Sequence, residues 1–171
     1  MREAYQKLIE KEMRLAGYSK KDARRIVKNV MKIETALADS TWTREESRNI
    51  PAMYNPRSIA QLKEMYPSIN WDRFFIETMG IETPAMVIVT NINTVKQADN
   101  LIASLTDREK KDYYLWNYVR QASGYLSDDF SDAAFEFSKV LSGAQSQRPR
   151  WKRALSTVEG AMGEAIGELY V

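Results

Sequence analysis

The chain has 171 residues, 44% of them hydrophobic and 11% aromatic, which is enough for one globular domain with a buried core. Its 25 basic and 23 acidic residues leave a net charge of +2, so no overall electrostatic field would attract nucleic acid or an anionic membrane. The chain has no histidine and no cysteine, and this excludes Ser-His-Asp and Cys-His catalysis, thiolate chemistry and metal sites built on those ligands.

The first half of the chain is expected to be helical, because apolar residues recur at helical spacing behind recognisable capping residues. Amphipathic helices are predicted over residues 3–16 and 20–39, and Ser19 with Asp22 resembles a capping box at the start of the second. Shorter helices are predicted behind three further capping signals: Thr43 with Glu46, Ser58 with Gln61, and Asn70, whose helix ends at Gly80.

Residues 85–90, with the sequence AMVIVT, are the one segment that has the composition of a β-strand. No second strand is expected within the chain. The segment is therefore predicted to be an extended connector, or to pair with protein outside this sequence. We expect a mainly all-α fold, namely an orthogonal, bundle-like lobe of about eight helices with at most one short strand, forming a single lobe over residues 1–171.

Further helices are predicted in the second half, over residues 94–105, 106–126 and 128–141. The middle one begins with a capping box formed by Thr106 and Glu109. Its aromatic residues occupy most of its circumference, which is typical of a central, buried helix. These residues are Tyr113, Tyr114, Trp116, Tyr118 and Tyr125.

The last predicted helix begins after Pro149 and continues to Val171 without a stop signal. Its apolar residues lie on one side, and three glycines lie on the other. Each glycine costs about 1 kcal/mol relative to alanine within a helix, so three on one side indicate close approach of another backbone. We expect the helix to pack on two sides, and the chain to be part of something larger. The apolar set is Leu155, Val158, Met162, Ile166 and Leu169, and the predicted interdomain packing residues are Gly160, Gly163 and Gly167.

No catalytic, cofactor-binding or metal-binding residue is predicted in this chain. The clustered acids stand at helix starts, where the helix dipole and free backbone N–H groups favour them, so a structural role is expected. A pair of acids for glycoside hydrolysis is the weaker alternative. The acids are Glu45 and Glu46 at one helix start, and Asp128, Asp129 and Asp132 at another.

Basic residues also cluster on one face of the second predicted helix. A solvated surface is the simplest interpretation, because no base-stacking side chains are interleaved with them. Binding of nucleic acid through this face is kept as an alternative. The residues are Lys20, Lys21, Arg24, Arg25, Lys28 and Lys32, and a second basic cluster comprises Arg148, Arg150, Lys152 and Arg153.

Several segments taken together resemble the neprilysin and endothelin-converting-enzyme family of zinc metallopeptidases, in its N-terminal, mainly helical domain. The resemblance covers about residues 20–171 and depends on the order of the segments. They are residues 46–75, AMVIVTNINTVKQADNLI, YYLWNYV, DDFSDAAFEFSKVLSG and RPRWKRALSTVEGAMGEAIGELYV.

The resemblance implies that this chain is a non-catalytic part of a two-lobed endopeptidase that cleaves oligopeptides. In such proteins the zinc ligands and the glutamate base lie in a C-terminal lobe, on an H-E-x-x-H helix and a later E-x-x-x-D. Neither motif occurs here, so zinc is expected only in the absent catalytic domain, and this chain alone is expected to be inactive. The helical lobe would cover the active-site chamber and keep out large substrates. Its expected partners are the catalytic domain of the same polypeptide and the oligopeptide substrates of the whole protein.

Two departures from the animal members are visible in the sequence. Ala154 stands where a disulfide-forming cysteine is expected, and the chain has no N-x-Ser/Thr glycosylation site. These features favour a bacterial relative, and the family favours an extracytoplasmic location. No run of apolar residues is long enough to span a membrane. A self-sufficient helical protein-interaction module without enzymatic activity remains the alternative.

Overall fold

Helices make up most of the chain, which confirms the mainly all-α fold class. The computed structural model describes residues 1–170, in which there are nine α-helices and one two-stranded sheet. The predicted extension of the last helix to Val171 lies outside these residues. The helices are α1 (Arg2–Leu15), α2 (Lys20–Asp39), α3 (Ile50–Met53), α4 (Ile59–Met65), α5 (Trp71–Arg73), α6 (Ile92–Ser104), α7 (Asp107–Ala122), α8 (Asp128–Ser142) and α9 (Arg150–Tyr170). The strands are β1 (Pro56–Ser58) and β2 (Met86–Ile88), 3₁₀ turns span Glu46–Arg48 and Ser123–Tyr125, and a π-helical turn spans Phe74–Thr78.

Four of the predicted caps begin α-helices, at Ser19, Ser58, Asn70 and Thr106, whereas the box of Thr43 and Glu46 leads only into a 3₁₀ turn. The Ser19 side chain accepts a hydrogen bond from the backbone of Asp22 at the start of α2. Full capping boxes open α4, at Ser58, and α7, at Thr106. A cap satisfies backbone N–H groups that have no partner within the helix, so these residues fix where each helix begins.

The predicted strand does have a partner within the chain, so the expectation of an unpaired strand was wrong. β2 pairs antiparallel with β1, and Arg57 lies opposite Val87. β1 is only three residues long and begins with Pro56, a residue that is poor in strands. Its extended conformation is stabilised by pairing with residues about thirty positions later, which local sequence patterns do not reveal.

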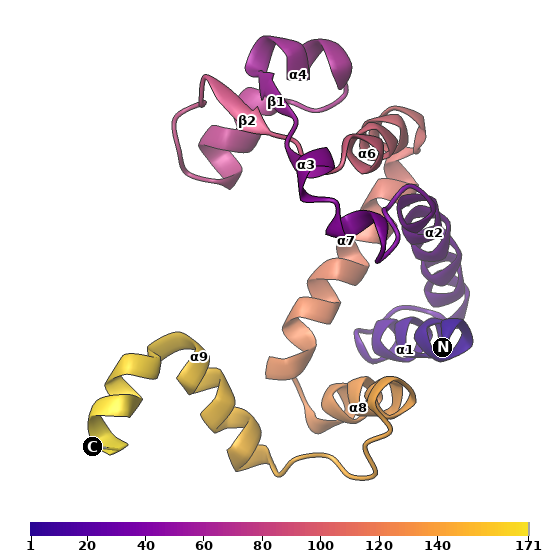
Figure 1. Ribbon diagram of the computed structural model, residues 1–171. Coiled ribbons are helices and arrows are strands. Elements are labelled where there is room, and N and C mark those ends of the chain that lie inside the picture. The colour runs from indigo at the N-terminus through magenta and orange to yellow at the C-terminus, as the bar shows by residue number, and fades with distance from the viewer. Residues whose placement is uncertain (171) are drawn as a thin grey trace.

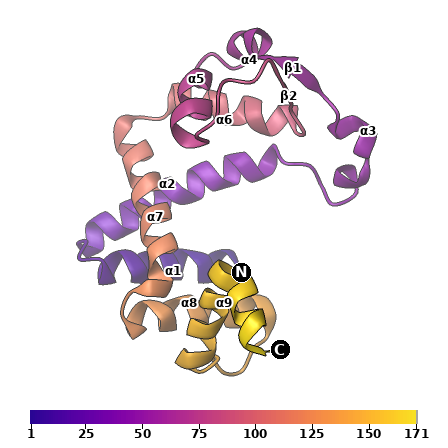
Figure 2. The same cartoon turned by 90° about the vertical axis from the view of Figure 1, so that its left-hand side faces the viewer.

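Two hydrophobic clusters organise the chain. The first, which we call the four-helix core, lies among α1, α2, α7 and α8. The second, the small cluster, lies among α4, α5, the π-helical turn, β2 and α6. In Figure 1 the strands and α4 stand at the top, away from α1 and α8, and α9 extends to the lower left. Figure 2 shows the same separation after rotation, with α2 and α7 between the upper and lower parts.

Trp116 on α7 is fully buried in the four-helix core. Its indole N–H donates to the Tyr5 hydroxyl at 3.0 Å, and that hydroxyl donates to Glu34 at 2.8 Å. Burial raises the pKa of Tyr5 to about 12, which keeps the hydroxyl protonated as a donor. This chain of hydrogen bonds joins α7, α1 and α2.

Asp112, one turn before Trp116, makes the second link between α7 and α2. Its buried carboxylate accepts from Arg25 Nε at 2.9 Å and from Arg25 Nη2 at 3.2 Å. Asn29 Nδ2 donates to the same carboxylate at 2.8 Å. A buried carboxylate with several donors is tolerated, whereas removal of one partner leaves the other charge uncompensated.

The prediction of a central, buried helix holds for one side of α7 only. Only the side that carries Trp116 is fully enclosed, and Tyr118 on the other side is 76% exposed. Tyr114, one turn before Tyr118, is exposed as well. Aromatic content alone did not distinguish a helix buried in this chain from one with an exposed aromatic face.

Glu12 on α1 is buried although it is acidic, and its Oε2 atom has no hydrogen-bond partner among the described residues. Burial raises the pKa of this carboxyl to about 7, and the positive charge of Arg120 lowers it by a smaller amount. Glu12 is therefore the acid in the four-helix core that opposes folding when it is ionised.

Replacement of Asp112 by alanine should destabilise the chain by about 2 kcal/mol, because Arg25 and Asn29 lose their buried acceptor while Arg25 keeps its contact with Asp22. Asp107→Ala, at an exposed position in the first turn of the same helix, should cost no more than about 1 kcal/mol. Urea denaturation of both variants measures the difference. Equal losses would mean that the buried pair does not stabilise the packing of α7 on α2.

Glu12→Gln should change how the stability depends on pH. The folded carboxyl titrates at about 7 and the unfolded one near 4.5, so the folded chain binds more protons between these values. The wild-type free energy of unfolding therefore falls as pH rises through that window, by up to about 3 kcal/mol. Glutamine does not ionise, so the free energy of unfolding of the variant should not fall in this way. The difference in unfolding free energy, variant minus wild type, should therefore increase from pH 4.5 to 7. Chemical denaturation across this range tests the prediction with the exposed Glu3→Gln as control, and parallel profiles would contradict it.

Candidate interdomain surface

The helix α9 begins as predicted, with Pro149 just before its first residue and accepting hydrogen bonds from the backbone of Lys152 and Arg153. The expectation of one uninterrupted helix was wrong, because the backbone of Met162 leaves helical geometry (φ −140°, ψ 39°). Gly160 and Gly163 flank this bend, and glycine is a frequent cause of helix kinks. The three predicted glycines therefore lie on two helical segments.

Both predicted packing sides of α9 are open within this chain. Apart from the neighbouring backbone of α9 itself, a Cβ atom built on any of Gly160, Gly163 and Gly167 would meet no heavy atom of the described residues within 4 Å. The predicted apolar residues, which we call the α9 apolar face, are Leu155, Val158, Met162, Ile166 and Leu169, of which Ile166 is half-buried and the other four are exposed. Exposed apolar residues gathered on one helix are typical of a surface that contacts another protein region.

Polar contacts join the start of α9 to the start of α8. Arg150 Nη1 donates to Asp128 at 3.1 Å, and Arg153 donates to the Ser131 hydroxyl. Gln147 Nε2 also donates to that hydroxyl, at 2.9 Å. A groove of about 800 Å³ runs between the two helices. The sequence contained a clue to this junction, since acids at the start of α8 complement the bases at the start of α9.

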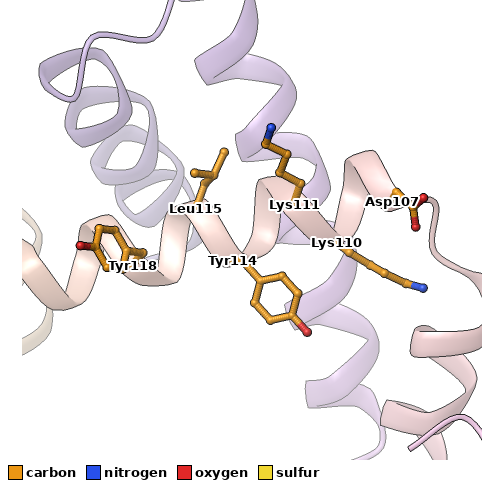
Figure 3. Close-up of a pocket in the computed structure, with 6 residues that line it drawn as sticks. All are labelled: Asp107, Lys110, Lys111, Tyr114, Leu115 and Tyr118. Atoms are coloured by element: carbon orange, nitrogen blue, oxygen red, sulfur yellow. The ribbon is translucent and has the colours of Figure 1, made fainter.

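A second hollow, of about 440 Å³, lies on the exposed side of α7. Figure 3 shows that every side chain lining it comes from this one helix. Within residues 1–170 no facing element closes this hollow, so its lining residues form an open surface rather than a pocket. The lining residues are Asp107, Lys110, Lys111, Tyr114, Leu115 and Tyr118.

Several of the other clustered charges form hydrogen bonds within a turn or ion pairs between helices. Glu46 accepts a hydrogen bond from the backbone of Thr43, which lowers the pKa of Glu46. On the basic face of α2, half of the residues form ion pairs with acids on other helices. Arg24 pairs with Glu10, Arg25 with Asp112, and Lys32 with Glu109.

The zinc ion that the resemblance implies does not fit the residues of this chain. The sequence has no histidine or cysteine, and among residues 1–170 no group of three acidic side chains could hold a metal ion. Nor does any helix in this part of the chain combine the length and apolar character needed to cross a membrane.

Comparison with known proteins identifies the family. The family model of the N-terminal part of peptidase family M13 matches residues 1–171. Endothelin-converting enzyme 1 of Rattus norvegicus is 30% identical over 161 residues, which cover 92% of this chain and 21% of the relative. Neutral endopeptidase of Lactobacillus helveticus is 31% identical over 158 residues, covering 92% of this chain and 24% of the relative.

Solved structures agree with these relatives. Zinc metalloprotease Zmp1 of Mycobacterium tuberculosis in complex with an inhibitor superposes with a TM-score of 0.91 and 29% identity, over 99% of this chain and 26% of Zmp1. The open state of Zmp1 gives a TM-score of 0.89 and 30% identity over 98% of this chain. The chain thus spans about a quarter of the length of the proteins it matches, and it belongs to peptidase family M13, in the N-terminal part.

Proposed function

We propose that this chain is the non-catalytic helical part of a longer zinc metalloendopeptidase. A region outside this sequence would supply the zinc ligands and the general base. The helical part would cover the active-site chamber, so that oligopeptides enter and large folded proteins do not. The whole protein would act outside the cytoplasm. The main support is the family match over the entire chain, to relatives about four times as long.

The open surfaces of α9 support an interdomain role. The chain superposes on Zmp1 with TM-scores of 0.89 and 0.91, over 98% and 99% of its residues. Burial of apolar surface contributes a stabilising free energy of about 25 cal/mol per Å². Contact of this exposed helix face with another region would therefore be favourable. We infer that the catalytic region of the same polypeptide covers the α9 apolar face and approaches the glycine side.

Activity should depend on the longer protein. With added zinc, the 171-residue chain should not cleave a fluorogenic oligopeptide, because it has no residues to hold the metal. The full product of the gene should cleave it in a zinc-dependent reaction, and should cleave a folded globular protein at least about 100-fold more slowly, a difference of about 2.7 kcal/mol in activation free energy. Cleavage by the 171-residue chain, or equal rates on the two substrates, would contradict the proposal.

Gly163→Leu should have different effects in the two proteins. In the 171-residue chain the new side chain meets open space, so stability should stay within about 1 kcal/mol of wild type, with a small gain in helix propensity. In the full gene product it should cost about 1–3 kcal/mol, because it overpacks the interdomain contact. Thermal denaturation of both proteins measures this. An equally large loss in both would mean that the glycine side is already packed within this chain.

A further inference from the structure

The sheet of β1 and β2 is hydrogen-bonded along one edge of β2 only. The backbone N–H of Val89 donates to the carbonyl of Asn55 at 2.9 Å. In an antiparallel ladder, successive residues point their backbone groups to opposite edges. Val87 therefore faces β1 as Val89 does, while the N–H and C=O groups of Met86 and Ile88 point to the other edge.

The outer edge of β1 is closed. Pro56 has no backbone N–H, and its carbonyl accepts from Arg57 Nη1 at 2.7 Å. The N–H of Ser58 is donated to Gln61 Oε1 at 2.9 Å within the capping box of α4. No further strand can add to β1, because its outward groups are absent or already bonded.

The outer edge of β2 is open. The backbone groups of Met86 and Ile88 form no hydrogen bond with any of residues 1–170. Soluble proteins protect such edges with charged residues, proline or bulges, or cover them. Residues 85–90 contain no charged residue and no proline. The sequence of β2 therefore does nothing to prevent another strand from pairing with this edge.

The side chains of β2 also divide into a buried and an exposed set. Val89 is buried in the small cluster, and Val87 packs against it. Met86 and Ile88, on the opposite face, are 61% and 54% exposed, and Tyr54 just before β1 is exposed as well. A two-stranded sheet with one solvent-exposed apolar face is marginally stable in water. Addition of a third strand would stabilise it.

We propose that the open edge of β2 pairs with a third, extended strand from the rest of the same polypeptide, with apolar side chains at alternate positions. The proposal rests on the proposed function, since it requires the longer protein. This chain spans only 26% of the length of Zmp1, so most of such a protein lies outside this sequence. A tethered strand also pairs at higher effective concentration than a free peptide or a second copy does.

Hydrogen exchange at single amides tests the proposal. In the full product of the gene, the amides of Met86 and Ile88 should exchange at least about 100-fold more slowly than in the 171-residue chain. The amides of Val87 and Val89 face β1 and serve as internal controls, which should be protected in both proteins. Equal exchange of Met86 and Ile88 in the two proteins would overturn the proposal.

Two proline variants form a matched pair. Ile88→Pro removes an outward N–H, so it should leave the protection of Val89 unchanged in the 171-residue chain. In the full product it should raise the exchange rate of Met86 by about 100-fold, because the third strand is lost. Val87→Pro removes a bond of the β1–β2 ladder and should expose Val89 in both proteins. Loss of Val89 protection in Ile88→Pro of the 171-residue chain would contradict the assigned edges.

The outcomes separate this proposal from the proposed function. If the full product cleaves oligopeptides with zinc but Met86 and Ile88 exchange as fast as in the 171-residue chain, the third strand is wrong and the function stands. If both amides are protected but no peptidase activity is found, the function is wrong and the strand stands. Protection that increases with the concentration of the 171-residue chain would assign the edge to a second copy and overturn the proposal.

Discussion

The attachment of α7 to α2 is the constraint on which the later part of the structure depends. Asp112 and Trp116 lie one turn apart on the same side of α7, and both are buried. Asp112 binds Arg25 on α2, and Trp116 reaches α1 through Tyr5. This fixes the rotation of α7 about its own axis. The 3₁₀ turn after α7 then leads into α8, and polar contacts at the start of α8 hold α9.

The same constraint decides which surfaces remain in water. With one side of α7 in the four-helix core, its tyrosines at the opposite side lie exposed, and α9 projects beyond the core with its apolar face uncovered. The small cluster adds a third open surface, at β2. A chain that spans about a quarter of Zmp1 and leaves apolar surface on three elements fits the proposal that the rest of a longer polypeptide covers some of it.

The sequence predicted the local features well, because they depend on residues three or four positions apart. The caps at Ser19, Ser58 and Thr106 fall where the capping signals placed them. Two of the features that it missed depend on distant partners, whereas the bend at Met162 lies between nearby glycines. β1 is extended because it pairs with β2, and α7 is buried on one side because only that side meets α1 and α2. Charge complementarity between Asp128 and the bases near Arg150 was visible in the sequence but could be assigned to a contact only with coordinates.

The central claim is that protein outside this sequence covers surfaces that are open in these 171 residues. Structure determination of the full gene product by electron cryomicroscopy tests it most directly. The account predicts that Leu155 and Val158 of the α9 apolar face, exposed here, become buried against another region of the same polypeptide. A full product in which the α9 apolar face remains in solvent would contradict it.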